Sequence, residues 1–466
     1  MERVFRRNSK CIGDGGVTME EYIGKLLEQV RFKKAHKGIE DELRAHIEDQ
    51  IDDNMVAGMD RDAAEKAAVA DMGDPVEVGI SMDRVHRPRL AWNVIIIAVI
   101  IGVISSVIHE IMALDASAAD AAISVLGSHS FYTKVLIGLV AMIAVYMIDY
   151  TVIAKYAKLI ALVMFGLLLV ASLGLTINGI HMYLHLGPIY FLTSAFMLLY
   201  IPLYGAIVYK YRGGGTASFF KALAWMIVPT IIVLRWPRLS TAIVMAMTMA
   251  VQLSVAVAKD WFKVPKKLTI SALWVAITVF PIGLLAFFYK NGLLSNYQTD
   301  RIRAFLYFDN DAAYVTKTVR SFNTVNFIGE SGKEVLGNLP NPNSDFLLTY
   351  LANKYGAVMV VAIVASVAAI IITGCIASAR SKNQLGLIMG VGCMNVLLVN
   401  MLVNLFENMG AIPYTDSFMP FFSAGGSNIV LAYIFLGVIL SIYKYKDAYP
   451  QHLDIGIRVK LKDLEM

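Results

Sequence analysis

The chain has 466 residues, of which 57% are hydrophobic and 17% are charged, and its mean hydropathy is +0.60. Soluble globular domains carry about 45–50% apolar and about 25% charged residues, so this composition excludes an ordinary cytosolic enzyme and predicts a membrane protein. The net charge of +5 comes without a basic stripe, which argues against a nucleic-acid partner, and the three cysteines form no CxxC pair that would indicate a metal site.

The first 89 residues form a charged head. They contain 15 Lys/Arg and 19 Asp/Glu, so 34 of the 89 residues are charged. Apolar residues at helical spacing predict short helices between residues 19 and 86. We expect Gly58 to end one helix, Asp60 to cap the next, and Gly73-Asp74-Pro75 to stop that helix and start another. The clearest helical run consists of Ile39, Leu43, Ile47 and Ile51.

This head resembles the small helical permease prefix domain that precedes bacterial membrane proteins. The resemblance covers about 50 residues and implies a regulatory or docking role without chemistry. It is carried by His46-Ile47-Glu48-Asp49, Gly58-Met59, Ala63-Ala64-Glu65 and Gly73-Asp74-Pro75.

Residues 90–466 are depleted in charge and predict an all-α polytopic membrane domain. A span needs about 20 mostly apolar residues, and ten segments meet this requirement. We therefore predict a head at 1–89, a ten-span domain at 90–446 with a large outer loop at 290–345, and a tail at 447–466. The expected spans are 91–113, 131–149, 157–177, 188–209, 219–235, 239–258, 268–289, 346–378, 385–406 and 426–443.

The distribution of Lys and Arg predicts the orientation. Cationic residues gather in loops on the head's side of the membrane, whereas the opposite loops at 114–130, 178–187 and 407–425 contain none. Because cytoplasmic loops carry an excess of Lys and Arg, we expect both termini to be cytoplasmic.

Four carboxylates, Glu110, Asp149, Asp345 and Glu407, sit in or beside the apolar spans. An ionisable side chain at membrane depth is unfavourable, so each is a candidate functional residue. Asp149 and Glu110 are also compatible with interfacial roles. Asp345 follows Pro340 and Pro342 at the start of the eighth span, where its side chain fits either an N-cap or a chemical role.

The membrane domain resembles the FtsW/RodA/SpoVE family. Several motifs occur in the family's order over residues 90–446. They are Asn178-Gly179 with Leu186-Gly187-Pro188-Ile189; Pro237 to Ala242; Tyr297, Arg301-Ile302, Phe305 and Asp309; Leu339-Pro340 through Asp345-Phe346 with Gly356; and Asn404, Gly410 and Pro413 followed by Pro420 to Ser427.

The resemblance implies a peptidoglycan glycosyltransferase of the bacterial cytoplasmic membrane that polymerises lipid II during cell wall synthesis, division or shape maintenance. It places the catalytic carboxylate on Asp345 and implies a class B penicillin-binding-type transpeptidase as partner. The pyrophosphate leaving group requires a divalent cation or basic side chains. The expected substrate-binding residues are Arg235, Arg238, Arg301, Arg303, Ser423, Gly425, Gly426 and Ser427.

Some family residues are replaced in this chain. The acid and the lysine expected at the start of the fourth span are Ala195 and Leu198, and Arg238 stands where the family has Asp. Asn341 replaces a Glu, and Asn353-Lys354 replaces paired acids. Two alternatives therefore stay open: a non-catalytic relative that binds lipid II or a partner, and a flippase for lipid-linked precursors.

Overall fold

A computed structural model describes residues 17–114, 121–171, 183–186, 189–235, 239–292, 314–321, 325–332, 341–415 and 417–452, together with residues 299, 303 and 339. The chain divides into two compact units. One unit, called here the head unit, contains residues 1–90 together with 380–384 and 443–453. The other, the membrane unit, contains residues 91–379, 385–442 and 454–466.

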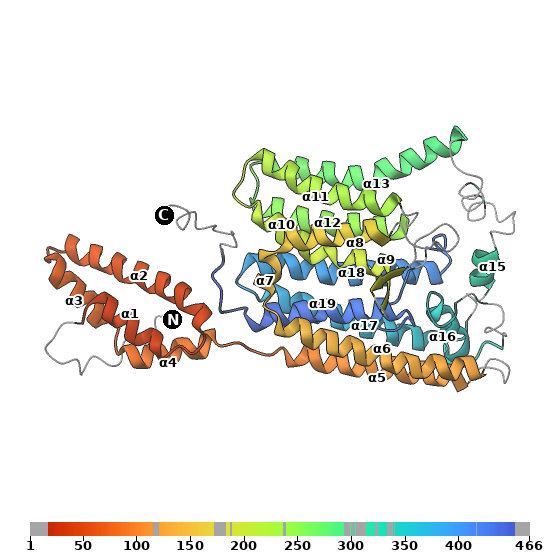
Figure 1. Ribbon diagram of the computed structural model, residues 1–466, viewed down its shortest axis with the longest axis horizontal. Coiled ribbons are helices and arrows are strands. Elements are labelled where there is room, and N and C mark those ends of the chain that lie inside the picture. Colours follow the sequence, from red (N-terminus) through yellow and green to blue (C-terminus); the bar gives the residue numbers. More distant parts are fainter. Residues whose placement is uncertain are drawn as a thin grey trace. The chain divides into compact units, whose positions relative to one another are not determined.

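Four helices form the head: α1 (Met19–Glu28), α2 (Lys33–Val56), α3 (Arg61–Asp71) and α4 (Pro75–His86) (Figure 1). The predicted turns are confirmed, since Gly58 and Gly73 both have the positive φ that glycine adopts readily. Asp74 caps α4 by accepting a hydrogen bond from Val76 N. Asp60 stands at the N-cap of α3, but its side chain makes no capping hydrogen bond.

The core of the head consists of apolar side chains from α1, α2 and α3. Helical spacing places Ile39, Leu43, Ile47 and Ile51 on one face of α2, and all four are buried. Burying a side chain of this size contributes about 1.5–3 kcal/mol. The run that sequence periodicity singled out is therefore the core face of the longest head helix.

Segments from the two ends of the chain meet in the head unit. The rings of Phe32 and Tyr445 stack with centroids 5.4 Å apart. Arg89 N donates a 3.1 Å hydrogen bond to Lys444 O. Asn383 Nδ2 donates to Pro450 O at 2.6 Å. Residues 380–384 and 443–453 therefore belong to the same packed structure as the head.

The membrane unit is built from long apolar helices (Figure 1). Eight helical segments among the described residues are long and apolar enough to cross a membrane. The helices of this unit are α5 (Trp92–Leu114), α6 (Ala121–Met147), α7 (Tyr150–Lys155), α8 (Ala157–Ala171), α9 (Thr193–Leu198), α10 (Tyr200–Lys210), α11 (Thr216–Arg235), α12 (Leu239–Ala258), α13 (Lys266–Lys290), α15 (Tyr314–Ser321), α16 (Leu347–Tyr355), α17 (Ala357–Ala379), α18 (Gln384–Asn408) and α19 (Gly426–Lys444).

A short hairpin replaces the beginning of the expected fourth span. Strands β1 (Tyr183–Leu186) and β2 (Ile189–Leu192) pair antiparallel, with Leu186 opposite Ile189. Tyr183 before a Gly-Pro pair, and Ile189, Tyr190 and Phe191 after it, are aromatic or β-branched residues that favour strands over helix here. The expected helix at 188–209 was therefore wrong at its start, because the helical part begins at Thr193.

The expected eighth span is divided into α16 and α17 at Gly356, whose φ is +93°. A neighbouring segment takes up backbone groups near this break: Ala357 N donates to Asn326 O and Gly329 N donates to Tyr355 O. A Cβ at position 356 would lie 2.7 Å from Phe327 O. Only glycine therefore fits this turn, which sets where α16 ends and α17 begins.

Candidate functional site

Asp345 lies in the turn directly before α16. Figure 1 shows α16 at the same end of the membrane unit as α15. Only 6% of its surface is exposed. Its Oδ2 accepts hydrogen bonds from Asn341 Nδ2 at 3.0 Å and from the Tyr414 hydroxyl at 2.9 Å. Its Oδ1 accepts from Ser344 Oγ at 3.2 Å. The carboxylate does not cap α16, since the donors that reach it within the described part of the chain are side chains and Phe346 occupies the N-cap.

The backbone of Asp345 is fixed by two amides of α18. Asn404 Nδ2 and Asn408 Nδ2 donate to Asp345 O at 2.9 and 2.8 Å. Asn408 Oδ1 in turn accepts from Thr349 N at 2.9 Å, which connects it to α16. Both asparagines are buried. Residues four apart on a helix share one face, so α18 presents a paired amide clamp to the Asp345 turn.

Glu407 lies on α18 between the clamp asparagines and is 2% exposed. It was expected just beyond the ninth span, but α18 extends to Asn408 and includes it. Its carboxylate accepts hydrogen bonds from Thr415 N at 3.0 Å, from Thr415 Oγ1 at 2.7 Å and from Ser417 Oγ. Glu407 therefore fixes the segment that carries Tyr414 to Asp345.

The Ser423–Ser427 segment packs against the same turn. Ser423 Oγ donates to Ser344 O at 2.9 Å, and Ala424 N donates to Asn343 O at 3.0 Å. Ser427 Oγ accepts from Leu192 N at 2.8 Å, at the end of β2. Gly425 directly precedes α19, which begins at Gly426. This predicted motif is thus brought together with Asp345, and its two serines serve to hold backbone segments.

Two basic side chains from α5 and α6 reach these segments. His109 is buried, stacks on Phe131 with centroids 3.7 Å apart, and places Nε2 3.2 Å from Asn343 O. Lys134 is half-buried, and its Nζ donates to Ala424 O at 3.1 Å. Neither residue belongs to the motifs singled out in the sequence.

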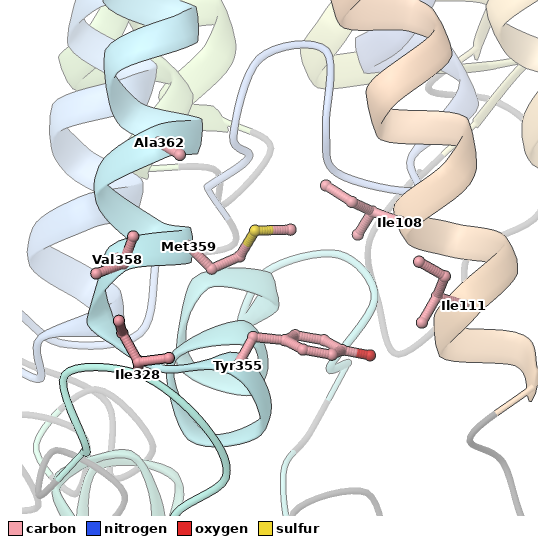
Figure 2. A pocket seen from close by; sticks show the side chains of 7 residues that line it. All are labelled: Ile108, Ile111, Ile328, Tyr355, Val358, Met359 and Ala362. Carbon is pink, nitrogen blue, oxygen red and sulfur yellow. The ribbon is translucent and has the colours of Figure 1, made fainter.

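An apolar cavity of about 330 Å³ opens between α5 and the α16–α17 break. Figure 2 shows Ile108 and Ile111 on one side, with Tyr355 and Met359 opposite them. Ile108 precedes His109, whose ring reaches the Asp345 turn. The cavity is completed by Ile328, Val358 and Ala362.

Of the four arginines expected to bind an anion, the structure describes the side chain of one. Arg303 is exposed. Arg238, Arg301 and the side chain of Arg235 lie outside the described residues. Within the described part of the chain, no three His, Cys, Asp or Glu side chains gather as a metal-binding group.

Asp149 and Glu110, the remaining candidate carboxylates, do not belong to the hydrogen-bonded cluster around Asp345 in the described structure. Asp149 caps α7 by accepting from Thr151 N at 2.9 Å and Thr151 Oγ1 at 2.8 Å, which gives it a structural role. Glu110 is partly buried, and its Oε2 is buried without a hydrogen-bond partner.

Tyr414 and Asn408 were missed in the sequence, although they contact Asp345 directly. Tyr414 is separated from Asp345 by 69 positions and from Glu407 by a turn, so no local pattern connects them. Asn404 and Asn408 did carry a signal, because two amides four residues apart in an apolar span must share a face. Polar pairs at helical spacing are therefore informative in membrane helices.

Long apolar helices, a polar cluster at one end of them and a carboxylate in a helix-preceding turn define a multi-pass membrane protein with a candidate active site. The chain belongs to the FtsW/RodA/SpoVE family of cell cycle proteins, whose family profile matches residues 88–448.

Curated relatives are distant in sequence. A probable peptidoglycan glycosyltransferase FtsW of Idiomarina loihiensis is 25% identical over 299 residues, which cover 61% of this chain and 70% of that protein. Stage V sporulation protein E of Bacillus subtilis is 25% identical and covers 66% of this chain and 84% of its own length. Peptidoglycan glycosyltransferase MrdB of Escherichia coli is 25% identical, with 67% and 84% covered.

Solved structures share the fold. One solved structure describes the structural coordination of polymerization and crosslinking by a peptidoglycan synthase complex. A chain of that structure superposes on this protein with a TM-score of 0.61 and 20% identity, covering 77% of this chain and 98% of that one. The rod shape determining protein RodA of Thermus thermophilus gives a TM-score of 0.55 with 18% identity, covering 77% and 97%.

Proposed function

We propose that this protein is a peptidoglycan glycosyltransferase that polymerises lipid II, with Asp345 as its general base. The observation that carries this proposal is the hydrogen bonding of the carboxylate. It accepts from Asn341, Ser344 and Tyr414. A carboxylate has about four acceptor positions, so the described contacts leave one for a substrate hydroxyl.

The reaction requires this acceptor. A sugar hydroxyl of one substrate attacks the anomeric carbon of another and transfers its proton to Asp345. The new glycosidic bond forms as the bond to the diphosphate oxygen breaks, through an oxocarbenium-like transition state. Undecaprenyl diphosphate leaves with the bonding electrons. Asp345 then releases its proton to water before the next cycle.

The apolar cavity beside the Asp345 turn supports a lipid-linked substrate. It is lined by aliphatic side chains and Tyr355, Met359 and Ile108 belong to its wall (Figure 2). Such a surface suits a section of polyprenyl chain. The diphosphate and sugars then extend toward the polar cluster.

We further propose ten membrane crossings with both termini cytoplasmic. α8 (Ala157–Ala171) and α13 (Lys266–Lys290) add to the eight long apolar segments. The excess of Lys and Arg on the head's side sets the orientation. Residues 1–89 act as a permease prefix-like regulatory domain, and a class B penicillin-binding-type transpeptidase is the partner.

The test is polymerisation of purified lipid II by the full-length protein, with and without its cognate transpeptidase, compared with Asp345→Asn. Asn keeps the size and can accept hydrogen bonds, but it cannot take up a proton at neutral pH. We expect a loss of about 10²–10⁴-fold in rate. Ser344→Ala is the matched control, since it removes one donor and leaves the base in place.

Equal rates for wild type and Asp345→Asn contradict the role of the base. A wild-type protein that is folded, binds lipid II and never forms glycan with any partner contradicts the enzyme itself. That second result favours a lipid II-binding regulator, and lipid movement between leaflets without polymer favours the flippase.

A further inference from the structure

The site described above contains a cation that the sequence motifs do not identify. Lys134 lies on α6 within the apolar segment Ser130–Met147. An ammonium group at this position is unfavourable in a membrane unless it interacts with protein, water or a ligand. Its side chain is half-buried, so it does not simply extend along the membrane surface into water.

The side chain of Lys134 is directed along the Ser423–Ser427 segment. A Cβ built on Gly426 would lie 3.3–3.4 Å from Lys134 Cγ, Cδ and Cε, so the aliphatic stem passes over this glycine. Nζ then donates to Ala424 O at 3.1 Å. Glycine at position 426 thus allows the stem to approach the backbone and fixes where the ammonium lies.

The same segment contacts the Asp345 turn on its other side. Ala424 N donates to Asn343 O, and Ser423 Oγ donates to Ser344 O. Ala424 therefore contacts Lys134 through its carbonyl and the Asp345 turn through its amide. One residue thus connects the cation to the turn that carries Asp345, which makes Lys134 part of the same site.

The ammonium group of Lys134 can donate more hydrogen bonds than the described contacts use. An ammonium group has three donors, and the described contacts use one of them, on Ala424 O. Among the described residues, no carboxylate lies within salt-bridge distance of Nζ. A neutral carbonyl leaves the positive charge uncompensated, so an anionic ligand is the partner that this position favours.

We propose that Lys134 binds the diphosphate of a polyprenyl-linked substrate at this site, a role that rests on the proposed glycosyltransferase function. A compact ammonium interacts well with phosphate oxygens as a point charge. Placed beside the Asp345 turn, it stabilises the negative charge that develops on the leaving diphosphate. The cation that binds the diphosphate would then come from helix α6.

The test measures binding separately from turnover. Full-length protein in phosphatidylcholine nanodiscs is titrated with undecaprenyl diphosphate, and bound lipid is counted by native mass spectrometry. Lys134→Gln is the main variant because its amide can still donate to Ala424 O while the charge is lost. Lys290→Gln is the matched control, an exposed lysine at the end of α13.

We expect Lys134→Gln to weaken binding of undecaprenyl diphosphate by roughly tenfold or more, the effect of one charge-assisted hydrogen bond. Lys134→Arg should retain much of the affinity, and Lys290→Gln all of it. Undecaprenol, which has no phosphate, should bind wild type and Lys134→Gln equally. In the polymerisation assay, kcat/KM should fall.

Two further ligands identify the source of the phosphate. Soluble pyrophosphate should bind more weakly than undecaprenyl diphosphate because it lacks the polyprenyl chain, but Lys134→Gln should weaken its binding by a similar factor. Phosphatidylglycerol should bind more weakly and respond less to the Lys134 change. An equal loss of phosphatidylglycerol and undecaprenyl diphosphate in Lys134→Gln overturns the proposal, because it indicates a general headgroup contact. Unchanged binding of undecaprenyl diphosphate, or none in the wild type, overturns it as well.

The outcome is separable from the glycosyltransferase assignment. If wild type binds undecaprenyl diphosphate through Lys134 but forms no polymer, the binding role stands and the enzymatic function fails. If Asp345→Asn loses polymerisation while keeping the lipid affinity of wild type, both roles hold in separate residues. If Lys134→Gln does not fold, Gly426→Ala, which displaces the stem, replaces it as the variant expected to lose affinity, and Lys134→Arg stays the charge-retaining control.

Discussion

The head unit and the membrane unit use polar and apolar residues in opposite ways. In the head, the buried cluster is apolar, from Tyr22 through Met72, and its charged side chains lie outside. In the membrane unit, aliphatic side chains such as Ile96 and Val103 are exposed, whereas Asn404, Glu407 and Asn408 are buried. Water favours a polar protein surface and lipid an apolar one. A buried apolar side chain in the head therefore indicates packing, whereas a buried polar side chain in the membrane unit indicates a candidate functional residue.

The strongest test of this contrast is Ile47→Ala in the head. Ile47 is fully buried, and removing its side chain leaves a cavity. We expect a destabilisation of the head by about 2–5 kcal/mol. Limited proteolysis and thermal unfolding of the full-length protein measure it. Val56→Ala on the same helix, where the side chain is 90% exposed, should change little, and equal effects would contradict the assignment of the core.

In the membrane unit the corresponding change is Asn404→Leu. It removes the donor to Asp345 O and leaves a buried carbonyl with one partner fewer. Because Asn408 still donates to Asp345 O, the loss is that of one hydrogen bond, about 0.5–1.5 kcal/mol. Thermal unfolding in detergent and lipid II polymerisation should both decline. Asn400→Leu is the control, because Asn400 is buried on the same helix but donates to Val396 O of its own helix.

A smaller effect is expected for Tyr414→Phe, which keeps the ring packed on Phe346 and removes the hydroxyl that donates to Asp345. The hydroxyl orients the carboxylate proposed as the general base, so its removal should lower the kcat of lipid II polymerisation a few-fold while KM changes little. Equal kcat values for wild type and Tyr414→Phe, with thermal unfolding unchanged, would contradict this positioning role.

The smallest effect is expected for Arg44→Ala on the head surface. Arg44 bonds Glu20 and Glu40, and its hydrogen bond holds the pKa of Glu20 below the usual 4.5. Because the pKa of Glu20 is lower in the folded state, its ion pair stabilises the head at pH values above the unfolded-state pKa. This stabilisation is lost as the pH falls through the folded-state pKa. Exposed ion pairs contribute little. Melting curves of wild type and variant should differ slightly at pH 7 and converge near pH 3.

The sequence predicted the parts of this structure that depend on local pattern. Helical periodicity located the α2 core face, and hydropathy located most of the long membrane helices. Motif resemblance located Asp345 and the Ser423–Ser427 segment. These features depend on residues that are close together in the chain, so a single sequence is enough to predict them.

Features that depend on tertiary contacts were not predictable in the same way. Hydropathy does not distinguish the strand Ile189–Leu192 from a helix end, because both are apolar. The contacts of Tyr414 and Lys134 join segments 69 and 290 positions apart. Arg303 is exposed, and its expected role in binding an anion stays a prediction.

The contact of Phe32 with Tyr445 has a consequence for engineered versions of this protein. The head unit includes residues 380–384 and 443–453, so it is assembled from three separate stretches of chain. A fusion that transfers only residues 1–89 to another protein leaves the partners of Phe32 and Arg89 behind. Grafts, split reporters and carboxyl-terminal tags should therefore keep the chain through Gln451, whose carbonyl accepts from Gln384 N.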